Sequence, residues 1–351
     1  MLSDRINSGA TKIRLDGLEN QGGQRLDELL EWLRMVGPAN QCSLQPASSD
    51  ASFRRYFRLV CSAGTLIVMD APPEREHLHS FIEVDRLFAG VGVRVPEIVE
   101  YDLNRGFMLL EDFGSTSYLS TLDTETAAEL YADAMQVLRL FNNDLDPGQS
   151  ELPRYDHHLV QREMGLFEEW FLAGKLGIRL TKAEVELLQS AKAFLTQVML
   201  EQPRVVVHRD FHSRNLMLVD GLNPGVLDFQ DAVVGPLTYD LVSLLRDCYI
   251  AWPETAVVQW VRDYFDGLNL DGVDFEQYYR WFDLTGLQRH MKALGIFSRL
   301  DLRDGKSDYL GDIPRTFDYV QAVASRYAEL SALDNFLTEI VSDRLSRVIP
   351  Q

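Results

Sequence analysis

The segment VVVHRDFHSRNLMLVDGLNPGVLDFQD, residues 205–231, decides the fold of this chain. Asp210 and Asn215 stand five positions apart in it, and Asp228 follows thirteen residues after Asn215. Apolar runs at 205–207 and 225–227 precede the two acids and favour short β-strands. The interval between the acids is long enough for a hairpin that returns the second beside the first. We therefore expect two carboxylates and an amide to meet at one site.

These residue types are the ones that phosphoryl transfer requires, namely an acceptor for a hydroxyl proton and oxygen ligands for magnesium on a triphosphate. We assign Asp210 as the proton acceptor, and Asn215 and Asp228 as the magnesium ligands. The spacing H-R-D-x-x-x-x-N is that of a kinase catalytic loop. An Asp near an Asn is common in turns, but three such elements in order, each after an apolar run, are hard to obtain by chance. The pattern specifies the reaction and leaves the phosphate acceptor open.

The bulk composition is that of an ordinary globular protein with room for two lobes: 351 residues, 46% hydrophobic and 25% charged. The formal net charge of −19 argues against nucleic acid or an anionic membrane as the main partner. No run of about 18 apolar residues is present, so we expect no membrane span.

The cysteines and the N-terminus bear on the compartment. Cys42, Cys61 and Cys248 form no C-x-x-C pair and leave one thiol over in any disulfide scheme, which favours a reducing compartment. Residues 1–20 carry scattered charges and no apolar core, which is not the pattern of a signal peptide. We expect a cytoplasmic protein.

Along the chain, the pattern changes from β-rich to helical near residue 115. Residues 1–23 are polar and are expected to form a flexible tail. Residues 24–114 are expected to form a nucleotide-binding lobe, with helices over 24–35 and 77–89 and strands over 53–60, 66–69, 98–101 and 106–110. Residues 115–351 are expected to form a helical lobe that holds the catalytic loop, with helices over 125–141, 159–172, 182–199, 240–250, 257–265, 275–294 and 319–347. The fold class is therefore α+β, with a ligand cleft expected between two lobes.

A loop of small residues at 47–52 opens the first hairpin. Small side chains let backbone N–H groups approach phosphates closely, so Ser48, Ser49 and Ser52 are candidate nucleotide contacts. Arg54 and Arg55 follow the loop directly and are candidate phosphate-binding cations, although either could equally lie on a solvated strand face.

With these residues in view, the chain resembles the aminoglycoside phosphotransferase-like kinases, relatives of protein kinases and choline kinase. The resemblance rests on the 208–215 motif, on Leu227-Asp228-Phe229 and on residues 239–241. Segments 47–56, 68–73, 225–232 and 295–300 are similar to bacterial kinases that phosphorylate N-acetylmuramate and N-acetylglucosamine at the anomeric carbon in cell-wall recycling. The likeness runs from about residue 26 to the C-terminus.

The resemblance implies a bilobal protein-kinase-like fold, with ATP and Mg²⁺ as cofactors. It implies that adenine meets the Leu110 carbonyl and the Asp112 amide, and that Asp240 either accepts hydrogen bonds from catalytic-loop amides or caps a helix. One departure stands out. Met69 occupies the end of the third strand, where such kinases carry a lysine for the α- and β-phosphates, and Asp85 and Glu83 are equal candidates for the acid that would pair with that lysine.

For the acceptor, we expect a pocket of helical-lobe side chains. The candidates are residues able to stack on or hydrogen-bond a sugar: Glu169, Trp170, Asp231, Arg289 and His290. Arg289 would meet the lactyl carboxylate of N-acetylmuramate, and Asp210 would take the proton from the C1 hydroxyl. Acceptors of the aminoglycoside, choline or homoserine type stay open, because fold does not set function. The missing lysine also leaves open a pseudokinase that binds nucleotide without turnover. Nothing in the sequence indicates an oligomeric state.

Overall fold

The structure is a computed structural model that describes residues 12–18, 23–38, 41–48, 53–76 and 78–349. The chain divides into two compact units, which we call the sheet unit (1–116 and 217–230) and the helical unit (117–216 and 231–351). The first boundary lies close to the predicted one at 115. The second differs, because residues 217–230 were assigned to the helical lobe. They belong to the sheet unit because Val226 donates to the Arg94 carbonyl and Phe229 packs on Phe81 and Phe88.

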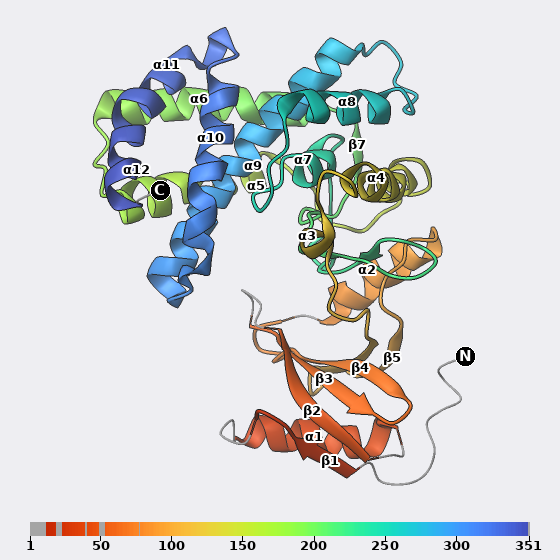
Figure 1. The fold of residues 1–351 in the computed structure, drawn as a ribbon. Helices are drawn as coiled ribbons and strands as arrows, with labels where there is room; N and C mark the ends of the chain where they lie inside the picture. The colour runs from red at the N-terminus through yellow and green to blue at the C-terminus, as the bar shows by residue number, and fades with distance from the viewer. Residues whose placement is uncertain (1–11, 19–22, 39–40, 49–52, 77, 350–351) are drawn as a thin grey trace. The chain divides into compact units, whose positions relative to one another are not determined.

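The sheet unit contains a six-stranded sheet in its described residues, in the order β1-β2-β3-β4-β6-β5. The strands are β1 Lys12–Leu15, β2 Gln41–Ser48, β3 Arg55–Cys61, β4 Gly64–Asp70, β5 Ile98–Asp102 and β6 Phe107–Glu111. Helix α1 (Gln24–Val36) lies along the sheet (Figure 1), and its leucines pack with Phe57, Leu59 and Val68. Helix α2 spans Leu78–Gly90. One face of the central strands is therefore occupied by α1.

The predicted N-terminal tail is wrong for residues 12–18. Strand β1 pairs in parallel with β2, with Ile13 opposite Cys42. Ile13 and Leu15 pack on the core and Leu18 is buried. The alternation of charged and apolar residues at 12–15 is a period-two strand signal that is short enough to be overlooked beside the polar residues around it. The rest of the predicted tail, 1–11 and 19–22, lies outside the described residues.

The cysteines do not support the reducing compartment that their spacing favoured, because two of them are paired. Cys42 and Cys61 stand directly opposite each other on β2 and β3 and form a disulfide, with a Cα–Cα distance of 4.3 Å. Cys248 is a buried free thiol. Spacing along the chain gave no hint of this pairing because strand register, which sequence spacing does not reveal, brings the two residues together.

The helical unit is built around α9 (Phe275–Asp304), whose residues 281–292 are buried without a break. A helix buried all round is a core helix. The other elements of this unit are helices and a short antiparallel pair of strands: α3 Tyr118–Thr121, α4 Ala127–Asn143, α5 His157–Leu166, α6 Lys182–Glu201, β7 Arg204–Val207, β10 Val233–Pro236, α7 Tyr239–Leu245, α8 Glu254–Phe265, α10 Ile313–Ala324, α11 Ser331–Phe336 and α12 Ser342–Val348. Two π-helical segments, Phe167–Lys175 and Leu337–Val341, and two 3₁₀ turns, Ser307–Asp312 and Ala328–Leu330, join them.

The predicted helices exist, with different bounds. Helix α9 runs ten residues beyond its predicted end and stops at Gly305, which has a φ of 66° in the left-handed region that favours glycine. The single helix predicted over 319–347 is divided into several shorter segments. No helix in the described part of the chain has the length and apolar character needed to cross a membrane. Strands β8 (Leu216–Met217) and β9 (Gly225–Val226) form a two-stranded ribbon after the catalytic loop.

Close packing of α9 on α5 requires Gly295. A Cβ at this position would lie 2.4 Å from the carbonyl carbon and 2.5 Å from the carbonyl oxygen of Leu166. We expect Gly295→Ala to lower the free energy of unfolding by about 1–3 kcal/mol, because backbone has to move. Urea unfolding measures this. The control is Gly165→Ala on α5, where a Cβ meets no atom within 4 Å and should be neutral or stabilising. Equal midpoints for Gly295→Ala and wild type would contradict the packing.

Candidate active site

The catalytic loop follows β7 in the helical unit and is held by Asp240. The Asp240 carboxylate accepts hydrogen bonds from the backbone N–H groups of His208 (2.6 Å) and Arg209 (2.9 Å). Thr238 is the N-cap of α7, so Asp240 does not cap the helix and instead orients the loop. Arg209 has a φ of 78°, an uncommon conformation for a residue with a side chain. The two bonds to Asp240 hold the two amides that lead into this turn.

Hydrogen bonds inside the loop connect the predicted base to one predicted metal ligand. The Asn215 side-chain amide donates to the Asp210 carbonyl oxygen at 3.0 Å. The buried His208 ring accepts from the Asp210 N–H through Nδ1 at 3.2 Å, which is a structural role. The Ser213 N–H donates to Asp247 at 2.9 Å. The position of Asp210 is therefore tied to that of Asn215.

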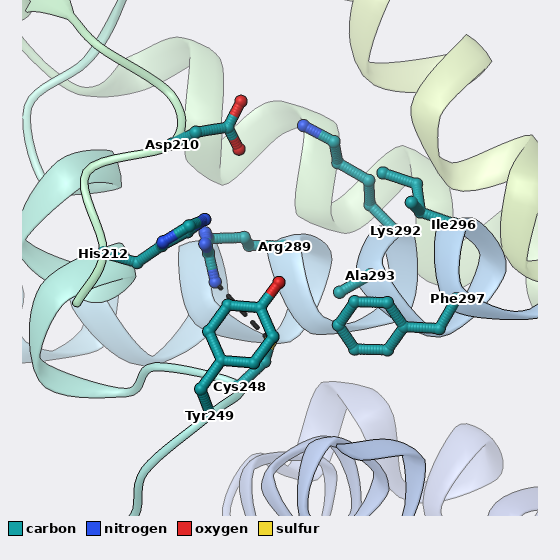
Figure 2. Close-up of a pocket in the computed structure, with 9 residues that line it drawn as sticks. All are labelled: Asp210, His212, Cys248, Tyr249, Arg289, Lys292, Ala293, Ile296 and Phe297. Atoms are coloured by element: carbon teal, nitrogen blue, oxygen red, sulfur yellow. Dashed lines mark hydrogen bonds between the residues drawn. The ribbon is translucent and has the colours of Figure 1, made fainter. Parts of the chain in front are cut away.

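A pocket opens beside Asp210 in the helical unit (Figure 2). Five of its lining residues come from one face of α9 and the others come from the catalytic loop and the segment after α7. The lining residues are Asp210, His212, Cys248, Tyr249, Arg289, Lys292, Ala293, Ile296 and Phe297. In Figure 2 the side chains of Asp210 and Lys292 point toward each other, and the Arg289 guanidinium lies next to His212 and donates to Cys248 Sγ at 3.8 Å. The pocket thus combines one carboxylate, two cations and aromatic rings.

Of the acceptor residues that the sequence predicted, Arg289 lies at this pocket. Lys292 was missed, although it could have been found, because positions 289, 292, 293 and 296 follow the i, i+3, i+4, i+7 spacing of one helical face. His212 of the catalytic loop also lines the pocket. Its ring packs edge-on against Tyr249, with 5.2 Å between centroids.

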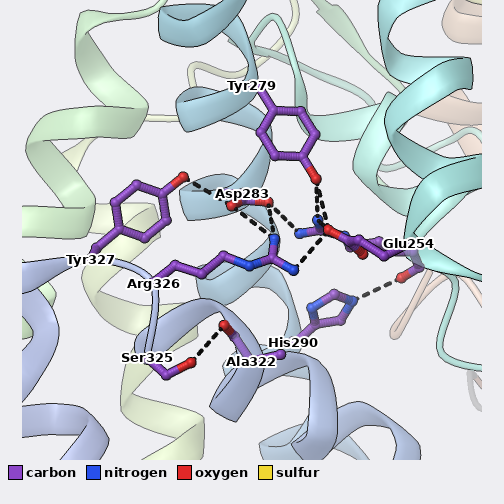
Figure 3. A network of polar contacts seen from close by, with 9 residues as sticks. Glu254, Tyr279, Asp283, His290, Ala322, Ser325, Arg326 and Tyr327 are labelled. Carbon is purple, nitrogen blue, oxygen red and sulfur yellow. Dashed lines mark hydrogen bonds and ion pairs between the residues drawn. The ribbon is translucent and has the colours of Figure 1, made fainter.

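The other predicted acceptor residues do not line this pocket. His290 bonds the Arg246 carbonyl through Nε2 at 2.8 Å in the polar network of Figure 3. Its ring also stacks on Tyr319. Asp231 is exposed, and its backbone carbonyl oxygen accepts from Arg209. Glu169 is exposed and Trp170 half-buried on the π-helical segment. A π-helix has a wider turn than an α-helix, so α-helical periodicity assigns its faces wrongly.

Charges around Asp210 decide its ionisation. Burial opposes the charged form, but the positive charge of Lys292, with smaller contributions from neighbours that include Arg209 and Arg289, lowers the pKa of Asp210 to about 2. Asp210 is therefore a carboxylate at neutral pH and can accept a hydrogen bond or a proton. The Lys292 ammonium is held by the Tyr239 hydroxyl and by Glu163, each at 3.1 Å.

Glu163 of α5 links the pocket to the catalytic loop. Its buried carboxylate pairs with Lys292 and with the Arg209 guanidinium, and it accepts from the Tyr155 hydroxyl. Burial disfavours its charged form, but Lys292 and Arg209 outweigh burial and lower the pKa of Glu163 to about 2. A buried carboxylate between two cations fixes both of them, so Glu163 sets the position of the ammonium beside Asp210.

The buried Asp240 carboxyl should make both stability and kcat depend on pH. Burial raises its pKa from the usual 3.8 to about 7; nearby Asp210 adds to this shift, and the two loop amides and Arg289 oppose it. Because this pKa is higher in the folded than in the unfolded chain, protonated Asp240 adds to the free energy of unfolding at low pH. This contribution is lost as the pH rises through about 7. The ionised form accepts the loop amides most strongly, so we expect kcat to fall as the pH is lowered through about 7. Asp240→Asn should have a lower kcat without this step. A flat wild-type profile between about pH 5 and 9, or a step that persists in the variant, would contradict this role.

Asp228 belongs to the sheet unit. It has a φ of 62°, in the left-handed region, and its Oδ1 accepts from the Gln230 side-chain amide at 2.7 Å. A carboxylate and an amide oxygen suit magnesium, which prefers oxygen ligands and is completed by phosphates and water. Asn215 belongs to the helical unit, so the binding of one ion by both residues stays a prediction.

The predicted nucleotide contacts are the loop serines, the residues Leu110 and Asp112, and two arginines. Ser49 and Ser52 lie outside the described residues, and Ser48 ends β2 with its side chain not described. Leu110 is buried in β6 opposite Ile67. The Asp112 carboxylate accepts from Arg58 at 2.6 and 3.0 Å. The expected adenine contacts of Leu110 and Asp112 stay predictions.

The two candidate cations differ. The Arg55 Nε donates to Asp70 at 3.0 Å, and the Arg25 Nε donates to the other oxygen of the same buried carboxylate at 2.8 Å. Arg55 is therefore committed to an ion pair with Asp70, and its predicted contact with the nucleotide stays a prediction. Arg54 instead pairs with Glu76 at 2.8 Å. Of the two predicted acids on α2, Asp85 is buried and Glu83 is exposed.

The sequence was compared with protein families and with known proteins. The model of the family described as "Phosphotransferase enzyme family" matches residues 43–280. The chain belongs to this family. It is 42% identical to an N-acetylmuramate/N-acetylglucosamine kinase of Pseudomonas putida, over 90% of this chain and 96% of that protein. It is 44% identical to the kinase of the same name from Pseudomonas aeruginosa, over 87% and 90%. The corresponding Neisseria meningitidis protein is 42% identical, over 91% and 97%.

Solved structures show the fold of this phosphotransferase. An aminoglycoside 2'-phosphotransferase-IIIa in complex with GDP aligns with a TM-score of 0.60 at 14% identity, over 87% of this chain and all of that chain. A choline/ethanolamine kinase family protein from Mesorhizobium loti aligns with a TM-score of 0.60 at 15% identity, over 89% and 99%. The predicted fold class, an α+β protein-kinase-like fold with a β-rich N-terminal part and a helical C-terminal part, is confirmed.

Proposed function

We propose that this phosphotransferase uses ATP and Mg²⁺ to phosphorylate the anomeric hydroxyl of N-acetylmuramate and N-acetylglucosamine. The observation that carries the proposal is the pocket beside Asp210, in which an ionised carboxylate stands next to two buried cations. The names of the relatives at 42–44% identity support the choice of sugars. Peptidoglycan recycling would be the process served, and the cytoplasm, which contains ATP, would be the compartment.

The charge of the pocket favours an anionic or neutral acceptor over a cationic one. Arg289 and Lys292 both line it and both are buried. A cationic aminoglycoside or choline would add charge of the same sign at short range, whereas a carboxylate such as the lactyl group pairs well with a guanidinium. The Tyr249 and Phe297 rings provide apolar surface for a sugar face. We assign Arg289 to the lactyl carboxylate.

In this mechanism, Asp210 accepts the proton of the C1 hydroxyl as that oxygen attacks the terminal phosphoryl group. A hemiacetal hydroxyl is more acidic than an ordinary alcohol, so a weak base suffices. Asn215 and Asp228 would hold magnesium, which neutralises charge on the phosphate oxygens when it is bound. Lys292, fixed by Glu163, keeps Asp210 ionised. Positioning and electrostatic stabilisation are expected to contribute more than proton transfer.

A coupled assay of ADP formation tests the proposal. The acceptors are N-acetylmuramate, N-acetylglucosamine, 1-O-methyl-N-acetylglucosamine, choline and kanamycin, each with MgATP. We expect turnover with both free sugars, and none with the 1-O-methyl sugar, choline or kanamycin. Equal turnover with the free and the 1-O-methyl sugar would move the reaction to another hydroxyl. ADP formation with none of the five, in a protein that binds MgATP, would favour a pseudokinase.

A further inference from the structure

Met69 occupies the strand position where related kinases carry a lysine that binds the nucleotide phosphates. Its side chain is fully buried on β4 and can neither donate a hydrogen bond nor carry charge. A triphosphate still needs positive charge near the metal. A cation placed next to a neighbouring strand could reach the same face of the sheet.

Strand register separates the two candidate arginines. Tyr56 stands opposite Met69, and Arg55 stands opposite Asp70. Residues opposite each other in a sheet share a face, and successive residues alternate between faces. Arg55 therefore lies on the same face as Phe57, which packs on α1. Arg54 directly precedes β3, and extending the alternation by one residue places it on the face of Met69.

The contacts of Arg54 lead to the predicted metal ligand. Its guanidinium pairs with Glu76 at 2.8 Å and lies 3.8 Å from the Asp228 carboxylate. The Arg54 and Glu76 side chains are only 9% and 13% exposed, whereas that of Asp228 is 32% exposed. All three residues belong to the sheet unit. A cation beside a carboxylate that binds the metal of a metal–nucleotide complex also lies beside the phosphates of that complex.

Glu76 is held in place independently of Arg54. Its backbone N–H donates to the Pro72 carbonyl at 3.0 Å, in a turn between β4 and α2. In the preceding residue, the Arg75 guanidinium lies over the Phe53 ring, 4.6 Å from its centroid. The segments 53–54 and 75–76 are thus joined twice, by a cation–π contact and by an ion pair. Glu76 is placed to restrict the direction of the Arg54 side chain.

We propose that Arg54 supplies the cation that the chain lacks at Met69, and that Glu76 is a positioning residue that aims Arg54 at the nucleotide phosphates. The pair would do the work of a lysine–glutamate pair, with the cation moved to the residue just before β3 and the acid moved to the turn before α2. A guanidinium suits this arrangement because its planar fork can bind a carboxylate on one edge and phosphate oxygens on another. This inference rests on the proposed nucleotide site.

Nucleotide binding without sugar tests the inference. Titration calorimetry would measure the affinities for MgADP and for adenosine, which lacks phosphates. We expect Arg54→Ala to weaken MgADP binding by about 10–100-fold, the size of one charge-assisted hydrogen bond, with adenosine affinity unchanged. Glu76→Gln, which leaves Arg54 present, should weaken MgADP binding severalfold. The matched control, Arg55→Ala, should leave the ratio of the two affinities unchanged. If MgADP affinity fell in Arg55→Ala and not in Arg54→Ala, the assignment would be overturned.

A charge exchange separates positioning from simple stabilisation. The double variant Arg54→Glu with Glu76→Arg keeps an ion pair but moves the cation. We expect its urea midpoint to lie closer to wild type than that of Arg54→Glu alone, while MgADP affinity stays low. Recovery of wild-type MgADP affinity would show that the pair is only structural. If Arg54→Ala does not fold, Glu76→Gln carries the test, and an unchanged affinity ratio in it would refute the positioning role. Because no sugar is present, these results are independent of the acceptor.

Discussion

Replacing Asp210 with asparagine is expected to lower kcat for MgATP and N-acetylmuramate by about 10²–10⁴-fold, the usual contribution of a general base. The side chain lines the acceptor pocket, and its pKa of about 2 keeps it ionised at neutral pH. Asparagine has nearly the same shape but cannot take a proton, so KM for the sugar should change much less than kcat. Steady-state kinetics with the coupled ADP assay measures both constants.

The control for this variant is Asp220→Asn, which removes an exposed acid from the segment that follows the catalytic loop. It should retain wild-type kcat. If Asp210→Asn kept kcat within about tenfold of wild type, below the range for a general base, proton transfer to Asp210 would not be part of the reaction.

Asp228→Ala is expected to be at least as damaging as the loss of the base. Removing a carboxylate ligand weakens the binding of the metal ion. In phosphoryl transfer, charge neutralisation and positioning usually contribute more to the rate than proton transfer does. The variant should also need a higher magnesium concentration for half-maximal activity, which a magnesium titration of the ADP-forming rate measures. Gln230→Ala, which removes only the amide that bonds Asp228 at 2.7 Å, should have a smaller effect on both quantities. Near wild-type turnover in Asp228→Ala would make the metal assignment wrong.

The catalytic loop was predictable because the residues that define its chemistry lie close together in the sequence. A base, an amide five positions later and a second acid after a hairpin need only local spacing, and the structure joins the first two by a hydrogen bond between Asn215 and the Asp210 carbonyl. The change from strands to helices near residue 115 was predictable for the same reason, since period-two and helical patterns are local.

The acceptor pocket was less predictable because it depends on helix rotation. Arg289 and His290 are neighbours on α9, yet Arg289 lines the pocket and His290 bonds the Arg246 carbonyl elsewhere. A helix buried on every side carries no amphipathic signal to show which face meets a ligand. Lys292 could have been found only by starting from Arg289 and applying helical periodicity.

Strand register accounts for the remaining differences. The opposition of Cys42 to Cys61, the pairing of Ile13 with Cys42 and the opposite faces of Arg54 and Arg55 all follow from which strands are neighbours and how they align. These pairings connect segments far apart in sequence, and a shift of one residue exchanges the two faces. Local patterns therefore identify strands but not their partners.

The central claim is that Asp210 activates the anomeric hydroxyl of a sugar for phosphorylation. The most direct measurement is phosphorus NMR of the product that wild-type enzyme forms from N-acetylmuramate and MgATP, with proton coupling used to locate the phosphate. We predict a phosphate coupled to the anomeric proton, and no product from Asp210→Asn on the same timescale. A phosphate coupled to protons at another ring position, or the same product formed at an undiminished rate by Asp210→Asn, would contradict it.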